Sequence, residues 1–382
     1  MPRRRPAAAR CGHGVRRVSR GAGGDECDEG DEGGGRVTDL TQAAAQPLLK
    51  VRDLVKSFPV RSSGFRGGRG LVHAVAGVSF DLHQGQTLSL VGESGCGKST
   101  TARCVVRILD PTSGQVEFDG VDLGTLDAAA LRSARSKFQM VFQDPQASLN
   151  PRMTVGEILA EPLKIHHIPG AEGRERIREL MSLVQLRSAD LDRYPHQFSG
   201  GQRQRIGIVR ALVLEPKLIA LDEPVSALDV SIQAEIIRLL ERLRDQLGLS
   251  YLFIAHDLSV VRHLSEHVAV MYLGKIVESG TNDEVYEQSA HPYTQALLAA
   301  APIPDPLIER SRDRIVLAGD PPSPIDPPSG CHFRTRCWKA QDRCAEEAPV
   351  LADPGIGHLV ACHFPEVSNV IVQQPVDFRR PT

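Results

Sequence analysis

This sequence of 382 residues has few aromatic residues, a small net charge and no long apolar run. Phe, Trp and Tyr together make up 4% of the chain, and the formal net charge is −2. The small net charge argues against nucleic-acid binding through bulk positive charge. No apolar run approaches the roughly 18–20 residues that span a bilayer, so we expect no transmembrane helix. No apolar segment follows the basic start Met1–Arg5, so we expect a cytosolic protein without a secretory signal.

The first 46 residues differ in character from the rest of the chain. They are rich in Arg, Gly, Ala and acidic residues and show no apolar periodicity, so we expect residues 1–46 to be disordered. Two interpretations stay open. The segment is either a flexible N-terminal extension with a function, or the product of a start assigned too far upstream, with translation beginning near Val37.

Residues 47–290 alternate short apolar runs with helical patterns. This alternation predicts an α/β fold with a mostly parallel sheet and a nucleotide at the carboxyl ends of its strands. The expected strands include residues 88–91, 218–221, 252–255 and 268–273. Residues 291–382 are Pro-rich and hold four cysteines, so we expect a small Cys-containing C-terminal extension there.

One segment follows the spacing of the phosphate-binding P-loop, G-x-x-x-x-G-K-[ST]. It consists of Gly92, Glu93, Ser94, Gly95, Cys96, Gly97, Lys98, Ser99 and Thr100. A strand-like run precedes it, and a helical pattern that reaches Leu109 follows. Glycines let backbone N–H groups converge on phosphate oxygens, and the helix N-terminus adds favourable partial charge. We therefore expect Lys98 to contact the β- and γ-phosphates of ATP, and Ser99 to be a ligand of Mg²⁺.

Two carboxylates follow the apolar run at 218–221. We expect Asp222 to hold Mg²⁺, directly or through water, and Glu223 to polarise the attacking water as a general base. A strand that ends in Asp-Glu is a weak indication by itself, and its position downstream of a P-loop gives it weight. Gln143 carries a neutral side chain that can accept and donate hydrogen bonds near Mg²⁺, so it joins this set.

The segment Ser199-Gly200-Gly201-Gln202, called the signature below, introduces another helical pattern. Two interpretations are open. The S-x-x-Q spacing is that of a capping box, which satisfies backbone N–H groups within the chain. The same glycines would also expose N–H donors to a second phosphate group. Because one chain needs a single γ-phosphate site, two sites suggest that each serves a different nucleotide in a face-to-face dimer.

These motifs, in this order, resemble the ATP-binding subunit of an ABC transporter. The resemblance covers about residues 48–290 and includes Ser226–Asp229 and His256. It implies a P-loop NTPase fold of the ABC type with a helical subdomain, in which the signature of one subunit caps the γ-phosphate bound by the other. It also implies that Asp229 lies in the loop joining the subunits. His256 would be the switch residue at the γ-phosphate, and Phe58 the residue that stacks on adenine.

Three further segments resemble the ATPases of oligopeptide and dipeptide importers, the second of the paired ATPases most: residues 143–154, 194–198 and 291–294. The resemblance implies a subunit that couples ATP hydrolysis to uptake of di- or oligopeptides, bound peripherally at the cytoplasmic face of the cell membrane. Its partners would be a paralogous ATPase subunit, two permease subunits and an extracytoplasmic solute-binding protein, with no nucleic acid. Importers of nickel or another small solute share much of this pattern, and a soluble ABC ATPase without a transport role is a further alternative.

Four cysteines are grouped in the C-terminal extension: Cys331, Cys337, Cys344 and Cys362. In a cytosolic protein, clustered cysteines bind metal more often than they form disulfides. The spacing lacks the C-x2-C pairs of common zinc sites, and all-thiolate ligation suits an iron–sulfur cluster or zinc about equally. The resemblance to peptide importers implies a [4Fe–4S] cluster, with Zn²⁺ or four unliganded thiols as alternatives. We expect three nearby histidines at the surface: His332, His358 and His363.

Overall fold

The structure is a computed structural model that describes residues 46–61, 69–301, 315, 317 and 319–368. All of these residues belong to one compact unit, Ala45–Thr382, so the Cys-containing extension is not set apart from the rest as a distinct domain. Apart from Gln46, the predicted N-terminal extension lies outside the described residues. In the part of the chain that the structure describes, no helix is both long and apolar enough to span a membrane.

A seven-stranded sheet forms the centre of the fold, with strand order β11-β10-β9-β3-β8-β7-β6. Five neighbouring strands are parallel: β9 (His267–Tyr272), β3 (Thr87–Val91), β8 (Ser250–Ala255), β7 (Leu218–Asp222) and β6 (Phe138–Val141). Every residue of β3, β7 and β8 is buried, which explains their continuous apolar runs. The predicted parallel α/β sheet is therefore confirmed, with its expected strands in place.

Two antiparallel features were not predicted from the sequence. Strands β10 (Lys275–Thr281) and β11 (Leu359–Val360) extend the central sheet antiparallel to β9. A separate four-stranded antiparallel sheet has the order β2-β1-β4-β5. Its strands are β1 (Leu49–Arg61), β2 (Arg69–Leu82), β4 (Ser113–Phe118) and β5 (Val121–Asp122). The fold is therefore a mixed α/β architecture with two sheets.

Helix α1 (Lys98–Val105) follows the P-loop and contacts strands of both sheets. It is shorter than the pattern up to Leu109 predicted. The backbone of Arg107 is left-handed, with a φ of 53°, and the N–H groups of Ile108 and Leu109 both donate to the carbonyl of Arg103. The left-handed residue ends the helix, because such a φ is incompatible with a continuing α-helix.

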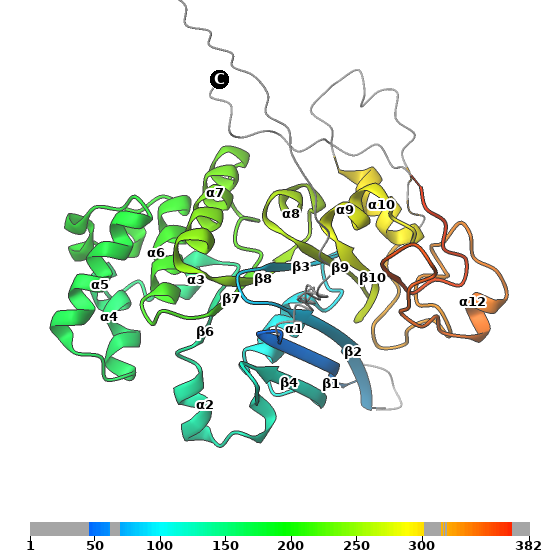
Figure 1. The fold of residues 1–382 in the computed structure, drawn as a ribbon, viewed down its shortest axis with the longest axis horizontal. Helices are drawn as coiled ribbons and strands as arrows, with labels where there is room; N and C mark the ends of the chain where they lie inside the picture. Colours follow the sequence, from blue (N-terminus) through cyan, green and yellow to red (C-terminus); the bar gives the residue numbers. More distant parts are fainter. Residues whose placement is uncertain (1–45, 62–68, 302–314, 316, 318, 369–382) are drawn as a thin grey trace, which may run out of the picture. The chain divides into compact units, whose positions relative to one another are not determined.

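The expected helical subdomain is present (green in Figure 1). It consists of α3 (Pro145–Ser148), α4 (Val155–Ile165), α5 (Gly170–Leu183) and α6 (Gly200–Leu212), with the short η2 (Ser188–Asp192) and η3 (Pro195–Gln197). Thr154 and Glu157 form a capping box at the start of α4. The other helices of the described residues are η1 (Leu123–Thr125), α2 (Ala128–Ala134), α7 (Val230–Leu247), α8 (Leu258–Leu264), α9 (Asn282–Glu287), α10 (Pro292–Ala300) and α12 (Arg343–Glu346).

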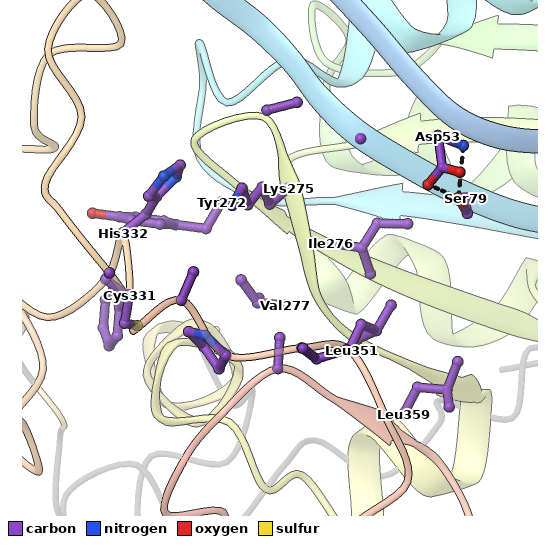
Figure 2. Close-up of a pocket in the computed structure, with 18 residues that line it drawn as sticks. Asp53, Ser79, Tyr272, Lys275, Ile276, Val277, Cys331, His332, Leu351 and Leu359 are labelled. Carbon is purple, nitrogen blue, oxygen red and sulfur yellow. Dashed lines mark hydrogen bonds between the residues drawn. The ribbon is translucent and has the colours of Figure 1, made fainter. Parts of the chain in front are cut away.

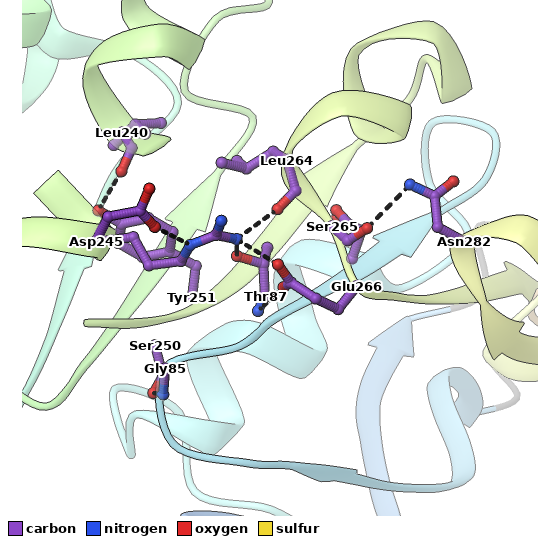
Figure 3. A network of polar contacts seen from close by, with 12 residues as sticks. Gly85, Thr87, Leu240, Asp245, Ser250, Tyr251, Leu264, Ser265, Glu266 and Asn282 are labelled. Carbon is purple, nitrogen blue, oxygen red and sulfur yellow. Dashed lines mark hydrogen bonds and ion pairs between the residues drawn. The ribbon is translucent and has the colours of Figure 1, made fainter. Parts of the chain in front are cut away.

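A polar network fixes the edge of the sheet at which β3 begins (Figure 3). Arg244, near the end of α7, donates to the Glu266 carboxylate at 2.7 Å, to the carbonyl of Leu264 at 2.9 Å and to the Thr87 hydroxyl at 3.1 Å. The backbone N–H of Thr87 donates to the other Glu266 oxygen at 2.7 Å. The network ties α7, β3 and the α8–β9 connection together at the edge of the sheet opposite the P-loop.

The C-terminal extension adds to the central sheet through β11 and through a buried hydrogen bond between His358 and Glu278. His358 Nε2 lies 2.9 Å from Glu278 Oε1 of β10, and both side chains are fully buried. Glu278 also accepts hydrogen bonds from the backbone N–H groups of Ala290 and His291. The expectation of a surface position was wrong for His358, because pairing with Glu278 offsets the cost of burying its imidazole.

A cavity of about 440 Å³ lies where the extension meets the two sheets (Figure 2). Asp53 and Ser79 line it from β1 and β2, Tyr272 and Lys275 from the β9–β10 hairpin, and Cys331 from the extension. The extension and strands of both sheets therefore line one common cavity.

Candidate nucleotide site

The P-loop connects β3 to α1, and two of its glycines are required by close backbone contacts. A Cβ atom at Gly92 would lie 2.2 Å from the carbonyl oxygen of Met271, and one at Gly97 would lie 2.1 Å from that of Ala74. Both glycines also have positive φ angles, 154° and 110°. Only glycine allows the loop to lie this close to β2 and β9, so neighbouring strands set its shape.

The loop is closed around the ammonium group of Lys98. Its Nζ donates to the carbonyl oxygens of Gly92 at 2.7 Å and Glu93 at 3.0 Å, and the residue is 3% exposed. Cys96 is buried beside it, and burial raises the pKa of the Cys96 thiol, which is therefore neutral at pH 7. The ammonium is thus the charge that the loop presents to an anionic ligand, and its two carbonyl partners are the groups that phosphate oxygens would replace.

The two predicted Mg²⁺ ligands are adjacent. Ser99 Oγ donates to Asp222 Oδ1 at 2.5 Å, and Asp222 lies fully buried at the end of β7. A hydroxyl and a carboxylate are oxygen ligands of the kind that Mg²⁺ prefers, so these residues fit the metal that the P-loop implies. Arg103 Nη2 lies 3.3 Å from the other Asp222 oxygen, a contact that was not predicted. Its position four residues after Ser99 on α1, on the same face, was the available signal.

The three residues predicted to act in hydrolysis also converge. Gln143 Nε2 donates to Glu223 Oε2 at 2.9 Å, and His256 Nδ1 lies 3.6 Å from the same oxygen. Glu223 has a φ of 45°, a strained conformation for a residue other than glycine. Its N–H donates to the carbonyl of Ile254 on β8 at 3.1 Å, which holds the strained turn in place. The carboxylate is therefore aimed by its backbone as well as by Gln143.

The signature forms the capping box that its spacing allows. Ser199 Oγ accepts from the Gln202 N–H at 3.3 Å, and Gln202 Oε1 accepts from the Ser199 N–H at 3.0 Å. Gly201 packs so closely on α7 that a Cβ would lie 2.6 Å from Ile232. Between the described parts of the signature and the P-loop, no hydrogen bond or ion pair is formed. The structure thus fulfils the capping interpretation within one chain, and a phosphate-binding role for the signature stays a prediction.

The side chains of Asp229 and Phe58 form no hydrogen bond or ion pair with the described residues of the P-loop. Asp229 is the N-cap residue of α7, and its carboxylate makes no capping hydrogen bond. Phe58 lies on β1, where Lys56 Nζ is 5.1 Å from the centre of its ring. The structure shows where both residues lie, and their roles toward a second subunit and toward adenine stay predictions.

The cysteines of the extension are free thiols that lie near one another. Burial raises the pKa of Cys331 and Cys337, and that of Cys362 to about 11, so these thiols are protonated at pH 7. Across the described ranges, no group of three or more His, Cys, Asp or Glu side chains is arranged to hold a metal ion. The residues as placed do not fit an iron–sulfur cluster or zinc, and no step of the reaction is derived through one.

Together, the P-loop, the Ser99–Asp222 pair, the Gln143–Glu223–His256 group and the signature helix define an ABC-type ATPase. The family model described as "ABC transporter" matches residues 75–226, and that described as "Oligopeptide/dipeptide transporter, C-terminal region" matches residues 277–344. The chain belongs to the ABC transporter ATP-binding proteins, in the branch of the oligopeptide transport ATP-binding proteins.

Similar proteins cover nearly the whole described chain. The oligopeptide transport ATP-binding protein AppF of Bacillus subtilis is 52% identical over 327 residues, which are 85% of this chain and 99% of AppF. The protein OppF of Salmonella typhimurium is 53% identical over 82% of this chain and 95% of its own length. Among solved structures, cbiO1 from Clostridium perfringens has a TM-score of 0.55 at 28% identity, covering 63% of this chain and 91% of cbiO1. The dimeric ABC transporter cassette MJ0796 also has a TM-score of 0.55, at 29% identity, covering 61% of this chain and 98% of MJ0796.

Proposed function

We propose that this chain is the ATPase subunit of an importer that takes up di- or oligopeptides through a membrane permease, at the cytoplasmic face of the membrane. The observation that carries the proposal is the similarity to oligopeptide transport ATP-binding proteins along almost their full length, including the C-terminal region at 277–344. The ATPase part rests on the nucleotide site, and the solute class rests on these relatives.

Different residues of the site would bind the phosphates, hold the metal and accept the proton during hydrolysis. Lys98 supplies a buried positive charge for the β- and γ-phosphates, and Ser99 with Asp222 would hold Mg²⁺. The metal, when bound, screens the negative charge of the phosphates. Glu223 accepts a proton from the attacking water, and Gln143 holds the carboxylate oxygen that would do so. His256 stands beside that oxygen, where it would meet the γ-phosphate.

The second half of each site would come from a paralogous subunit. Ser199 and Gly200 are exposed at the start of α6, so this end of the helix is accessible to a neighbouring chain, whose phosphate would compete with Gln202 for the Ser199 N–H. The start of α7, with Asp229 and the strongly exposed Val230, lies close to the signature, because a Cβ atom at Gly201 would lie 2.6 Å from Ile232 of α7. The solved MJ0796 cassette is described as a dimer, which supports a paired arrangement here as well. A face-to-face dimer would place each signature over the nucleotide of the partner.

A groove beside Gln143 suits a short helical element of the permease. Its volume is about 320 Å³, and its apolar lining includes Ile108, which is 47% exposed, and Phe142, the neighbour of Gln143. Arg135, Glu161 and Arg210 supply charged groups around these apolar residues. An element with one apolar face and polar ends would bury the exposed Ile108 and contact the segment that holds Glu223.

ATPase measurements on the purified importer complex test this function. The complex would contain this chain, its paralogue and both permease subunits, and the solute-binding protein would be loaded in turn with oligopeptide or Ni²⁺. Peptide-loaded binding protein is expected to stimulate hydrolysis, and Ni²⁺-loaded protein is not. Stimulation by Ni²⁺ alone would assign the nickel alternative, and hydrolysis insensitive to any permease partner would assign a soluble ATPase.

A further inference from the structure

The P-loop is held by a residue of the distant C-terminal extension. Arg336 forms a bidentate ion pair with Glu93, the second residue of the loop: Nη1 lies 2.7 Å from Oε2 and Nη2 lies 3.0 Å from Oε1. The two residues are 243 positions apart in the sequence. The Arg336 side chain is 6% exposed and that of Glu93 is 28% exposed, so solvent screens the pair only in part.

Glu93 is also anchored through its backbone. Its N–H donates to the hydroxyl of Tyr293 on α10 at 2.8 Å. Its carbonyl oxygen accepts from Lys98 Nζ at 3.0 Å. A shift of Glu93 therefore moves one of the two carbonyl groups that surround the phosphate-binding ammonium, and the ion pair with Arg336 opposes such a shift.

An aromatic cluster fixes the turn that carries Arg336. The ring of Phe333 is buried, with its centre 5.2 Å from that of Tyr272 and 5.4 Å from that of Tyr293. The N–H of Arg336 donates to the carbonyl of Phe333 at 3.0 Å. Because the apolar anchor and the guanidinium lie on the same turn, packing of Phe333 sets the position of Arg336 before any nucleotide binds.

We propose that Arg336 is a positioning residue for nucleotide binding, which acts on the P-loop through Glu93. Two physical effects combine. The ion pair fixes the loop in one geometry, and it neutralises a carboxylate that would otherwise stand unpaired on a loop that binds a polyanion. The inference rests on the proposed ATP site and goes beyond it, because it makes the C-terminal extension part of that site.

Nucleotide titrations of the full-length chain test the proposal. The probe is methylanthraniloyl-ATP with Mg²⁺, followed by fluorescence, with wild type, Arg336→Gln, Glu93→Gln and the double variant. Arg336→Gln is expected to raise the dissociation constant about 5- to 150-fold, the range of coupling between linked sites. The double variant is expected to bind no more weakly than Arg336→Gln, because both changes remove the same pair. Additive losses would contradict this.

Arg343→Gln is the matched control. Arg343 pairs with Glu347 at 3.2 Å on the same extension, and both side chains are more than half exposed. Its loss should leave the dissociation constant unchanged, since a solvated pair away from the loop contributes little. An equal loss of affinity in Arg343→Gln would show a general effect on folding of the extension and would overturn the role of Arg336.

Separate measurements of KM and kcat distinguish a role of Arg336 in positioning the P-loop from general damage to the fold. In the importer complex, Arg336→Gln should raise the KM for ATP with kcat close to that of wild type, because no reacting group is removed. If Arg336→Gln does not fold, Arg336→Lys is tested in its place, because lysine keeps the charge and loses the bidentate geometry. Its affinity for the nucleotide is expected to be lower than that of wild type. Unchanged affinity in either folded variant overturns the proposal. A wild-type chain that binds no nucleotide would instead contradict the proposed function.

Discussion

Gln143 and Glu223, 80 residues apart in the sequence, share a hydrogen bond of 2.9 Å between Nε2 and Oε2. Gln143 stands at the edge of the groove beside Phe142, and Glu223 is the predicted general base. His256 Nδ1 lies 3.6 Å from the same oxygen. A displacement of Gln143 by a permease element in the groove would therefore change the contacts of the carboxylate directly, which gives a short physical route from permease to hydrolysis.

Replacement of Glu223 separates binding from hydrolysis. Glu223→Gln keeps the shape of the side chain but removes the base, so hydrolysis by the assembled complex should fall about 10²- to 10⁴-fold. Affinity for ATP should stay close to that of wild type, because Lys98, Ser99 and Asp222 are untouched. Steady-state ATPase rates and nucleotide titrations measure the two quantities, and a normal rate in this variant would remove Glu223 from the role of base.

Loss of the Lys98 ammonium should impair binding itself. Lys98→Ala removes the buried charge that faces the phosphates, and the dissociation constant for Mg-ATP should rise roughly 10- to 150-fold, the range for hydrogen bonds to charged groups. Lys164→Ala, at an exposed position of α4, is the control and should bind ATP normally. Equal affinities for Mg-ATP in the two variants would contradict the role assigned to Lys98.

Two glycine-to-alanine changes should have opposite effects on stability. In Gly97→Ala the new methyl group would meet the carbonyl of Ala74 at 2.1 Å, on a backbone with a φ of 110°, so the unfolding midpoint should fall and nucleotide binding should be lost. Gly207 lies inside α6 with open space around its would-be Cβ, so Gly207→Ala should stabilise by about 0.4–1 kcal/mol. Thermal unfolding of both variants checks the pair, and a stable Gly97→Ala protein that binds ATP would refute the described packing of the loop.

His291 should make stability fall on mild acidification. Burial lowers its pKa from 6.5 to about 4, and its neutral Nδ1 accepts the N–H of Tyr293 at the start of α10. The unfolded chain takes up this proton near pH 6.5 and the folded chain only near pH 4, so the stability supplied by neutral His291 is complete above pH 6.5 and is lost as the pH falls toward 4. The unfolding free energy should therefore drop by about 2 kcal/mol between pH 7 and pH 5 from this residue.

The variant His291→Asn isolates that contribution. Asparagine can cap the same helix without titrating, so urea unfolding of this variant should lose less stability between pH 7 and pH 5 than wild type does. His196→Gln, at an exposed position, serves as the control and should follow wild type. The same pH dependence in all three proteins would show that His291 does not contribute.

The sequence predicted what is local and missed what depends on tertiary packing. The P-loop is contiguous, so its spacing, preceding strand and following helix carry the whole signal. The Asp222–Glu223 pair gained weight from its position downstream of the P-loop, because a strand that ends in two carboxylates is common. Arg336 gave no such signal, because its partner lies 243 residues away and nothing in the local pattern distinguishes this buried arginine from arginines that are exposed. The burial of His358 likewise depends on Glu278, on a strand that the extension reaches only in the folded chain.

The antiparallel sheet was not predicted, and the ligand of the four cysteines was left open, because both depend on how distant segments pack. Strand β1 is half-exposed and irregular, with register shifts against β2, so its apolar pattern is weaker than that of the buried parallel strands. For the cysteines, sequence spacing does not fix the distances between sulfur atoms, which depend on the turns between them. Clustering in the sequence favoured a metal and the resemblance favoured an iron–sulfur cluster, but the described residues hold no group of three or more ligands arranged for a metal ion.

Transport in proteoliposomes tests the central claim most directly. The importer complex is reconstituted with ATP and Mg²⁺ on the side of this chain and with solute-binding protein and a labelled oligopeptide on the other. We predict ATP-dependent accumulation of the peptide, which is abolished when this chain carries Glu223→Gln while the peptide still binds its binding protein. Accumulation that persists with Glu223→Gln, or no peptide accumulation by a wild-type complex that hydrolyses ATP, would contradict the account.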